Sequence, residues 1–151
     1  MPSVIFVCTG NICRSPTAEA IFKNRVKTLG FDVVSDSVGI YDYHEGESPD
    51  YRSIEIAIKH GIDMSDLLAR KIISNDFDSF DYIIAMDRGH KKSLLNIALE
   101  EQRPKISLLL DFHEKYRGMD VPDPYYGGMQ GFEHTFKLIE QGVDALISDI
   151  F

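Results

Sequence analysis

The apolar residues of this chain of 151 residues form short continuous runs separated by amphipathic stretches. Residues 4–7 read VIFV, a β-branched and aromatic run typical of a strand buried on both faces of a parallel sheet. Further apolar runs predict strands over 33–39, 82–86 and 106–110. Apolar residues recurring every three or four positions predict helices over 16–29, 49–60, 88–99 and 131–150.

Predicted strands and helices alternate along the chain, which favours an α/β fold. We expect a three-layer arrangement, a four-stranded parallel sheet with helices on both faces, in a single domain over residues 1–151. Residues 40–49 are expected to form a loop, and residues 62–80 a short helix with irregular backbone. Because ligands of such folds bind at the carboxyl ends of the strands, the segment after the first strand is the first candidate site.

Charge and cysteine content narrow the function. Sixteen basic against 24 acidic side chains give a net charge of −8, which argues against nucleic acid or an anionic membrane as partner. The apolar run at the N-terminus is too short for a signal peptide, and no stretch approaches the ~18 apolar residues of a membrane span. Two cysteines favour a reducing, cytoplasmic setting. The histidines show no ligand spacing, so we expect no metal and no cofactor.

The first predicted strand ends at Cys8, and Thr9-Gly10-Asn11-Ile12-Cys13-Arg14-Ser15-Pro16 follows. A short loop between a strand and a helix can turn successive backbone N–H groups inward, and the helix N-terminus adds partial positive charge. The Arg14 guanidinium can bind two oxygens of one phosphate. The segment therefore predicts a phosphate-binding loop, a site for a tetrahedral oxyanion, formed by Thr9, Gly10, Asn11, Ile12, Cys13 and Ser15.

The same positive field acts on Cys8, because helix N-termini and nearby cations stabilise a thiolate. Ser15 is expected to donate a hydrogen bond to that thiolate or to the loop, and also to cap the helix. Gly10 and Asn11 tolerate the left-handed backbone that a tight loop needs. Glu19 comes one position too late for a capping box, so we assign it only a contribution to the helix dipole.

Three segments carry a resemblance to a known family. They are the loop motif from Val7 to Pro16, Asp123-Pro124-Tyr125-Tyr126-Gly127, and Phe80-Asp81-Tyr82-Ile83 before Met86-Asp87. Over essentially its whole length the sequence resembles the low-molecular-weight protein tyrosine phosphatases. The resemblance implies that Cys8 is a nucleophile forming a phosphocysteine, that Arg14 binds phosphate and stabilises the transition state, and that Asp123 is general acid and then base.

The resemblance also implies a substrate and a redox role. An aromatic wall is expected from Tyr43, with Tyr125 and Tyr126 opposite, which suits phosphotyrosine in proteins or peptides and small aryl phosphates. Inorganic phosphate and other oxyanions are expected inhibitors. Cys13 is expected to form a disulfide with Cys8 under oxidation, although a packed core thiol is an equal interpretation. We expect a monomer and leave weak self-association open.

Some positions depart from the family pattern. A histidine that often supports the phosphate loop would fall near Asp66, where there is none, so we expect Ser37 to contribute to that support. Asp87 falls at the carboxyl end of a predicted strand, near the site, and is expected rather to cap a helix. The run from His90 to Lys92 is expected to be a solvated helix face.

Three alternatives to a tyrosine phosphatase remain at this point. An arsenate reductase of the same fold would need further cysteines after Cys13, and the chain has none. A protein-arginine phosphatase favours threonine where this chain has Ile12, and a loop less rich in tyrosine near the acid. A non-catalytic phosphate-binding or redox-sensing module would need only Cys8 and Cys13, and Asp123 in its motif speaks against it.

Overall fold

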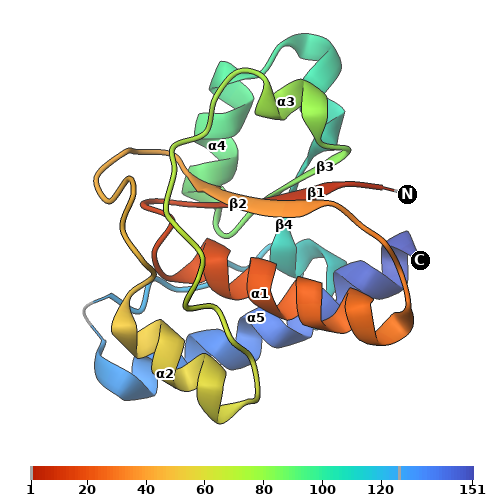
Figure 1. The fold of residues 1–151 in the computed structure, drawn as a ribbon. Helices are drawn as coiled ribbons and strands as arrows, with labels where there is room; N and C mark the ends of the chain where they lie inside the picture. The colour runs from red at the N-terminus through yellow and green to blue at the C-terminus, as the bar shows by residue number, and fades with distance from the viewer. Residues whose placement is uncertain (1, 126) are drawn as a thin grey trace.

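The computed structural model describes residues 2–125 and 127–151 (Figure 1). Its centre is a parallel sheet of four strands in the order β2-β1-β3-β4. The strands are β1 (Val4–Cys8), β2 (Ser35–Gly39), β3 (Tyr82–Ala85) and β4 (Ile106–Leu108). The predicted four-stranded parallel sheet is thus confirmed, with β1 and β3 at its centre.

Helices cover both faces of this sheet (Figure 1). Helices α1 and α5 lie on one face, with α2 packed against α5, and helices α3 and α4 lie on the other. Their bounds are α1 (Arg14–Leu29), α2 (Tyr51–Lys59), α3 (Asp76–Ser79), α4 (Arg88–Ile97) and α5 (Gly128–Ile150), and two 3-10 helices flank β4, η1 (Glu100–Lys105) and η2 (Leu109–Phe112). The predicted three layers are confirmed. No helix in the described part of the chain is long and apolar enough to cross a membrane.

Strand β1 is buried along its whole length, which explains its continuous apolar run. Successive strand residues point to opposite faces. Val4 and Phe6 therefore join the core that includes α1 and α5, whereas Ile5 and Val7 join the core beneath α3 and α4. The strand is anchored on both sides, so its carboxyl end, where Cys8 stands, is a fixed point.

Helices α1 and α2 begin elsewhere than the sequence suggests, and α5 begins at Gly128, three residues before its predicted start. Helix α1 begins at Arg14, with Cys13 as its N-cap residue and no side-chain cap, so the prediction that Ser15 caps this helix is wrong. Helix α2 begins at Tyr51 because the Asp50 carboxylate accepts a hydrogen bond from the Arg52 N–H, at 2.9 Å, and so caps its first turn.

Strands β2 and β4 are each two residues shorter than predicted, and β3 is one residue shorter. Strand β2 begins at Ser35; the preceding Val34 is 68% exposed, and its carbonyl still accepts a hydrogen bond from the Val4 amide at 3.0 Å. Strand β4 ends at Leu108, where the chain turns into the 3-10 helix η2. The first difference lies at the amino end of β2, and the second lies beside the carboxyl end of β3, because Leu108 pairs with Ala85.

Candidate active site

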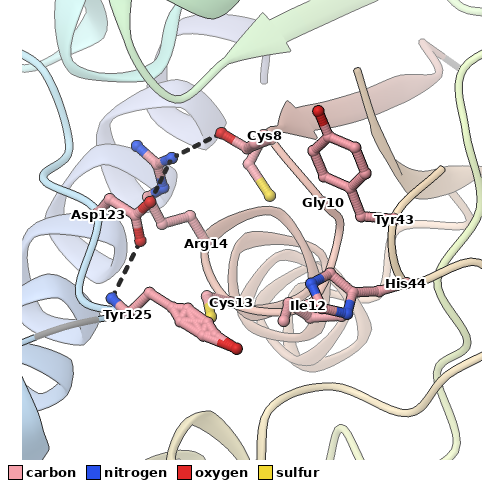
Figure 2. A pocket seen from close by; sticks show the side chains of 10 residues that line it. Cys8, Gly10, Ile12, Cys13, Arg14, Tyr43, His44, Asp123 and Tyr125 are labelled. Carbon is pink, nitrogen blue, oxygen red and sulfur yellow. Dashed lines mark hydrogen bonds and ion pairs between the residues drawn. The ribbon is translucent and has the colours of Figure 1, made fainter. Parts of the chain in front are cut away.

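A pocket opens at the carboxyl end of β1 (Figure 2). Arg14 comes from the start of α1, Tyr43 and His44 from the loop after β2, and Asp123 and Tyr125 from the segment before α5. The pocket is lined by Cys8, Thr9, Gly10, Ile12, Cys13, Arg14, Tyr43, His44, Asp123 and Tyr125. Residues more than a hundred positions apart in the sequence thus converge on one cleft.

The backbone of the loop between β1 and α1 is tied down through its carbonyl groups. The carbonyls of Cys8, Thr9 and Ile12 accept hydrogen bonds from the amides of Ile40, Tyr41 and Asp50, at 2.9, 3.0 and 2.8 Å. By contrast, no amide of residues 9–14 donates a hydrogen bond to any residue that the structure describes. A row of unpaired N–H groups next to a helix N-terminus is the arrangement that binds anions.

Asn11 fixes the shape of this loop. Its backbone is left-handed, with φ of 59°, as its sequence position suggested, whereas Gly10 does not use a positive φ. The Asn11 side-chain amide donates to the hydroxyls of Ser15 and Ser37, at 2.8 and 2.9 Å, and its carbonyl accepts from the Arg70 amide at 3.0 Å. The three hydrogen bonds of the Asn11 side chain therefore fix the conformation of the loop.

The support continues from Ser37 to a buried carboxylate. Ser37 donates to Glu19 Oε1 at 2.6 Å, which brings Ser37 into the loop support as predicted. Glu19 is 3% exposed and forms an ion pair with Lys23 one turn later in α1. The prediction that Glu19 contributes only to the helix dipole is therefore wrong. Its carboxylate ends the chain of hydrogen bonds that starts at Asn11, and no histidine is needed there.

Cys8 Sγ lies 2.9 Å from Ser15 Oγ. Asn11 donates to that same hydroxyl oxygen, which leaves the serine proton free to point elsewhere. Ser15 Oγ also lies 3.3 Å from the Val38 carbonyl, a longer contact than the one to sulfur. The hydroxyl is therefore placed to donate to a thiolate, as the sequence suggested.

Arg14 is a buried cation with one edge held by the protein. Its Nη1 donates to Asp87 Oδ2 at 2.8 Å and to the Val121 carbonyl at 2.9 Å, which uses both protons of that nitrogen. Its Nη2 donates to Thr9 Oγ1 at 3.3 Å. Nε has no partner among the described residues. The edge formed by Nε and Nη2 is therefore the one available to an oxyanion.

Two residues of this environment were missed by the sequence reasoning. Asp87 caps α4 as predicted, accepting the His90 N–H at 2.8 Å, but its other oxygen also binds Arg14, a role that the preference for a cap left out. His90 is 7% exposed and contacts Thr9 Oγ1 at 2.8 Å, so it is not part of a solvated face. A side chain just after the second central strand of a parallel sheet was the signal available for Asp87.

Asp123 stands at the mouth of the pocket. Its Oδ1 accepts the Tyr125 N–H at 3.0 Å, a turn that fixes the carboxylate, and its Oδ2 lies 3.7 Å from Arg14 Nη2 (Figure 2). The side chain is 50% exposed, so it keeps half of its contact with water. The carboxyl group can therefore reach both a bound substrate and solvent.

Aromatic side chains form two sides of the cleft. Figure 2 shows Tyr43 and Tyr125 on opposite sides of the Cys8 sulfur. Tyr41 stacks on Tyr43 with ring centroids 5.0 Å apart, and the Arg52 guanidinium lies 5.4 Å from the centre of the Tyr125 ring. Tyr126, the third predicted aromatic, lies outside the described residues.

His44 is a lining residue that the sequence reasoning left out. Its ring lies against Gly10, where an added Cβ would come within 2.9 Å of His44 Cδ2. Its Nδ1 contacts Glu47 Oε2 at 3.2 Å. A side chain at position 10 would therefore require the His44 ring to shift.

Cys13 is a free, buried thiol on the wall of the pocket that also contains Cys8. Burial raises the pKa of the Cys13 thiol to about 12, and the charges of Cys8 and Asp50 act in the same direction. Cys13 is therefore a protonated thiol beside its neighbour at neutral pH.

Together these features define an α/β protein with a cleft for an oxyanion and a thiol at its base. No group of three or more potential metal-ligating side chains occurs in the described ranges. The groups that the cleft offers to a ligand are a guanidinium edge, unpaired amides, a thiol, a carboxyl and two phenol rings. A cleft with these groups suits a phosphate ester as ligand.

Comparison with known proteins identifies the family. A family model described as low molecular weight phosphotyrosine protein phosphatase matches residues 3–150. The low molecular weight protein-tyrosine-phosphatase YfkJ of Bacillus subtilis is 43% identical over 152 residues, covering 99% of this chain and 96% of the relative. The chain belongs to the low molecular weight protein-tyrosine phosphatases, which are phosphoric monoester hydrolases, and the predicted family and enzyme class are confirmed.

Solved structures agree with this assignment. The crystal structure of a protein tyrosine phosphatase from Entamoeba histolytica superposes with a TM-score of 0.94 at 37% identity, covering 99% of this chain and 97% of that one. An arginine phosphatase from Drosophila superposes with a TM-score of 0.89 at 33% identity, covering 97% and 96%. The fold is therefore common to phosphatases of different named specificity.

A pH dependence follows from the burial of His90. Burial and the charge of Arg14 lower the pKa of His90 from 6.5 to about 4, against the opposite effect of Asp87. Between these values the unfolded chain binds a proton that the folded chain does not, so stability falls as the pH falls. The slope is at most about 1.4 kcal/mol per pH unit. When the free energy of unfolding is measured in urea at pH 7, 6 and 5, His90→Asn should lose the part of the pH dependence that comes from His90.

The control for this measurement is Lys92→Gln, an exposed position on the same helix, which should keep the wild-type dependence. Parallel stability curves for wild type and His90→Asn between pH 6.5 and 4 would show that the imidazole is not held neutral by the fold.

Proposed function

We propose that this phosphatase hydrolyses phosphotyrosine in proteins or peptides, and small aryl phosphates, through a phosphocysteine intermediate. The observation that carries the proposal is the convergence of Cys8, Arg14 and Asp123 on one pocket, from two segments far apart in the sequence. A nucleophile, an oxyanion-binding cation and a proton donor are the three groups that this reaction requires.

Binding comes first in the proposed mechanism. The unpaired amides of residues 9–14 and the Nε–Nη2 edge of Arg14 bind the phosphate oxygens, and the N-terminus of α1 adds favourable charge. Ser15 donates to the Cys8 sulfur and so stabilises it as a thiolate close to the phosphorus. Inorganic phosphate and other oxyanions would occupy the same groups and inhibit.

The first chemical step transfers the phosphoryl group to sulfur. The Cys8 thiolate attacks phosphorus, an S–P bond forms, and the P–O bond to the phenol breaks. Asp123 gives its proton to the departing phenolate oxygen, so tyrosine leaves neutral. Arg14 stabilises the charge on the oxygens of the phosphoryl group in flight.

The second step releases phosphate. Asp123, now a carboxylate, takes a proton from water, whose oxygen attacks phosphorus and breaks the S–P bond. Cys8 leaves as a thiolate and Asp123 is again protonated. The half-exposed position of the Asp123 side chain supports this exchange, because it borders both the pocket and solvent.

The substrate class is proposed from the walls of the cleft. A phenyl ring between Tyr43 and Tyr125 would bury its faces against aromatic surface, and each such contact contributes roughly 0.5–1.5 kcal/mol beyond area burial. A phosphoserine has no ring to fill this space. A protein-arginine phosphatase is the second candidate, because a protein named for that activity shares the fold.

Substrate preference can be tested with three peptides of one sequence carrying phosphotyrosine, phosphoserine or phosphoarginine. We expect kcat/KM for phosphotyrosine to exceed that for phosphoserine by about a hundredfold. Cys8→Ser is the control and should reduce turnover by at least roughly a thousandfold. A preference for phosphoarginine would replace the proposed substrate, and turnover retained by Cys8→Ser would remove its nucleophile.

The role of Asp123 predicts a dependence on the leaving group. Asp123→Ala should lower kcat/KM, which reports the first chemical step, by roughly 10²–10⁴-fold for phenyl phosphate and much less for p-nitrophenyl phosphate, because nitrophenolate needs little protonation to leave. Asp120→Asn changes a nearby carboxylate that pairs with Arg88, and it should keep the wild-type ratio of the two rates. Equal losses on both substrates in Asp123→Ala would argue against a general acid at this position.

We also propose that Cys13 protects Cys8 from irreversible oxidation. Peroxide oxidises the Cys8 thiolate to a sulfenic acid, and the Cys13 thiol condenses with it, which forms an S–S bond and releases water. Two free cysteines on one pocket support this step. Cys13→Ser should make peroxide inactivation harder to reverse with added thiol; unchanged recovery after matched exposure would contradict it.

A further inference from the structure

His90 is a buried histidine that the proposed chemistry does not use. It lies on α4, across the sheet end from the loop, and it is 7% exposed. Its Nε2 is 2.8 Å from Thr9 Oγ1, a contact between residues 81 positions apart. Its Nδ1 is 3.2 Å from Asp87 Oδ1, close enough for electrostatic attraction, although it makes no hydrogen bond within the described residues.

The direction of the contact with Thr9 follows from these neighbours. A ring nitrogen this close to a carboxylate oxygen is favoured as N–H, so we assign the proton of the neutral imidazole to Nδ1. Nε2 is then an acceptor, and the Thr9 hydroxyl donates to it. Because the Thr9 hydroxyl proton is donated to His90 Nε2, a lone pair of Thr9 Oγ1 faces Arg14 Nη2 and accepts a hydrogen bond from it at 3.3 Å.

These contacts close a ring around the guanidinium. Arg14 Nη2 donates to Thr9, Thr9 donates to His90, and the N–H of His90 faces Asp87. The other Asp87 oxygen accepts from Arg14 Nη1 at 2.8 Å, which returns to the starting residue. Both terminal nitrogens of Arg14 are thereby fixed, so the ring sets the orientation of the free Nε–Nη2 edge.

We propose that His90 is a positioning residue of this phosphatase: by accepting the Thr9 hydroxyl proton it directs Thr9 oxygen to Arg14 and aligns the guanidinium for the phosphoryl group. The inference rests on the proposed role of Arg14 as the phosphate-binding cation. His90 itself touches neither substrate nor nucleophile. Its effect passes through Thr9 and Asp87.

The charge state of His90 suits this role. Its low pKa, caused by burial and by Arg14, keeps the ring neutral at the pH of an enzyme assay. A protonated ring would donate from Nε2 instead of accepting, and would place a second cation beside Arg14. An ammonium or guanidinium at this position could not replace the acceptor for the same reason.

Two amide variants separate the two ring nitrogens. Glutamine can place its carbonyl oxygen near the position of Nε2 and so accept from Thr9, whereas asparagine is shorter and reaches only the position of Nδ1. Thr9→Val removes the hydroxyl at nearly constant volume and tests the same link from the other side. Lys92→Gln on the exposed side of α4 is the matched control.

The experiment measures kcat, KM and the inhibition constants of inorganic phosphate and vanadate with p-nitrophenyl phosphate as substrate. His90→Asn and Thr9→Val should each lower kcat/KM and weaken both oxyanions by about tenfold, the loss expected for one hydrogen bond to a charged group. His90→Gln should recover most of the loss. The double variant should lose no more than either single one, because both interrupt the same ring.

The inference is overturned if His90→Asn keeps wild-type oxyanion affinity, or if losses in the double variant multiply. If His90→Asn fails to fold, Thr9→Val and His90→Gln decide the question alone. Cys8→Ser in the same series tests the proposed function separately. If Cys8→Ser loses turnover but still binds vanadate, the assignment of Cys8 as the nucleophile is supported, whatever the result at His90.

Discussion

The buried guanidinium of Arg14 is the constraint on which the rest of this site depends. Removing a cation from water is costly unless it is paired and hydrogen-bonded. Here the pairing comes from Asp87 after β3 and from the Val121 carbonyl, two segments that the chain brings together only when the sheet has formed. Folding and assembly of the phosphate-binding edge are therefore one event.

This arrangement also explains how an acidic protein can bind an anion. The chain carries a net charge of −8, yet two carboxylates near the pocket are already engaged by cations. Asp87 is held by Arg14 and by the start of α4, and Asp50 forms an ion pair with Arg52. The loop amides and the N-terminus of α1 carry no negative charge that would repel a phosphate. The pocket is thus locally favourable for a phosphate while the rest of the surface remains acidic.

The loop shape has a separate support on its other side. Asn11 connects the loop to Ser37 on β2 and to the backbone at Arg70, and Ser37 passes the connection on to the buried carboxylate of Glu19. Arg14 and Asn11 therefore have different roles in the phosphate-binding site. The first presents the charge, and the second holds the backbone whose amides face an oxyanion.

The sequence predicted what is local, the family resemblance supplied the distant Asp123, Tyr43 and Tyr125, and three supporting contacts between distant segments were missed. Strand β1 was predicted from its apolar run because it is buried on both faces. The residues of the loop from Cys8 to Ser15 are contiguous, so the phosphate-binding loop could be predicted from the sequence alone. The contacts of Asp87, His90 and Glu19 depend on strand order and register, which pair residues 73, 81 and 18 positions apart. Each looked like an ordinary helix residue, and only the folded sheet gives it a partner.

The most direct test of the account is to trap the covalent intermediate. In Asp123→Ala, whose second step lacks its base, rapid acid quenching of p-nitrophenyl phosphate turnover followed by peptide mapping should place a phosphoryl group on the Cys8 peptide. The same treatment of Cys8→Ser should yield no phosphorylated cysteine peptide. A phosphoryl group on another residue, or rapid turnover with no phosphoenzyme under conditions where hydrolysis of the intermediate limits the rate, would contradict the central claim that Cys8 is the nucleophile.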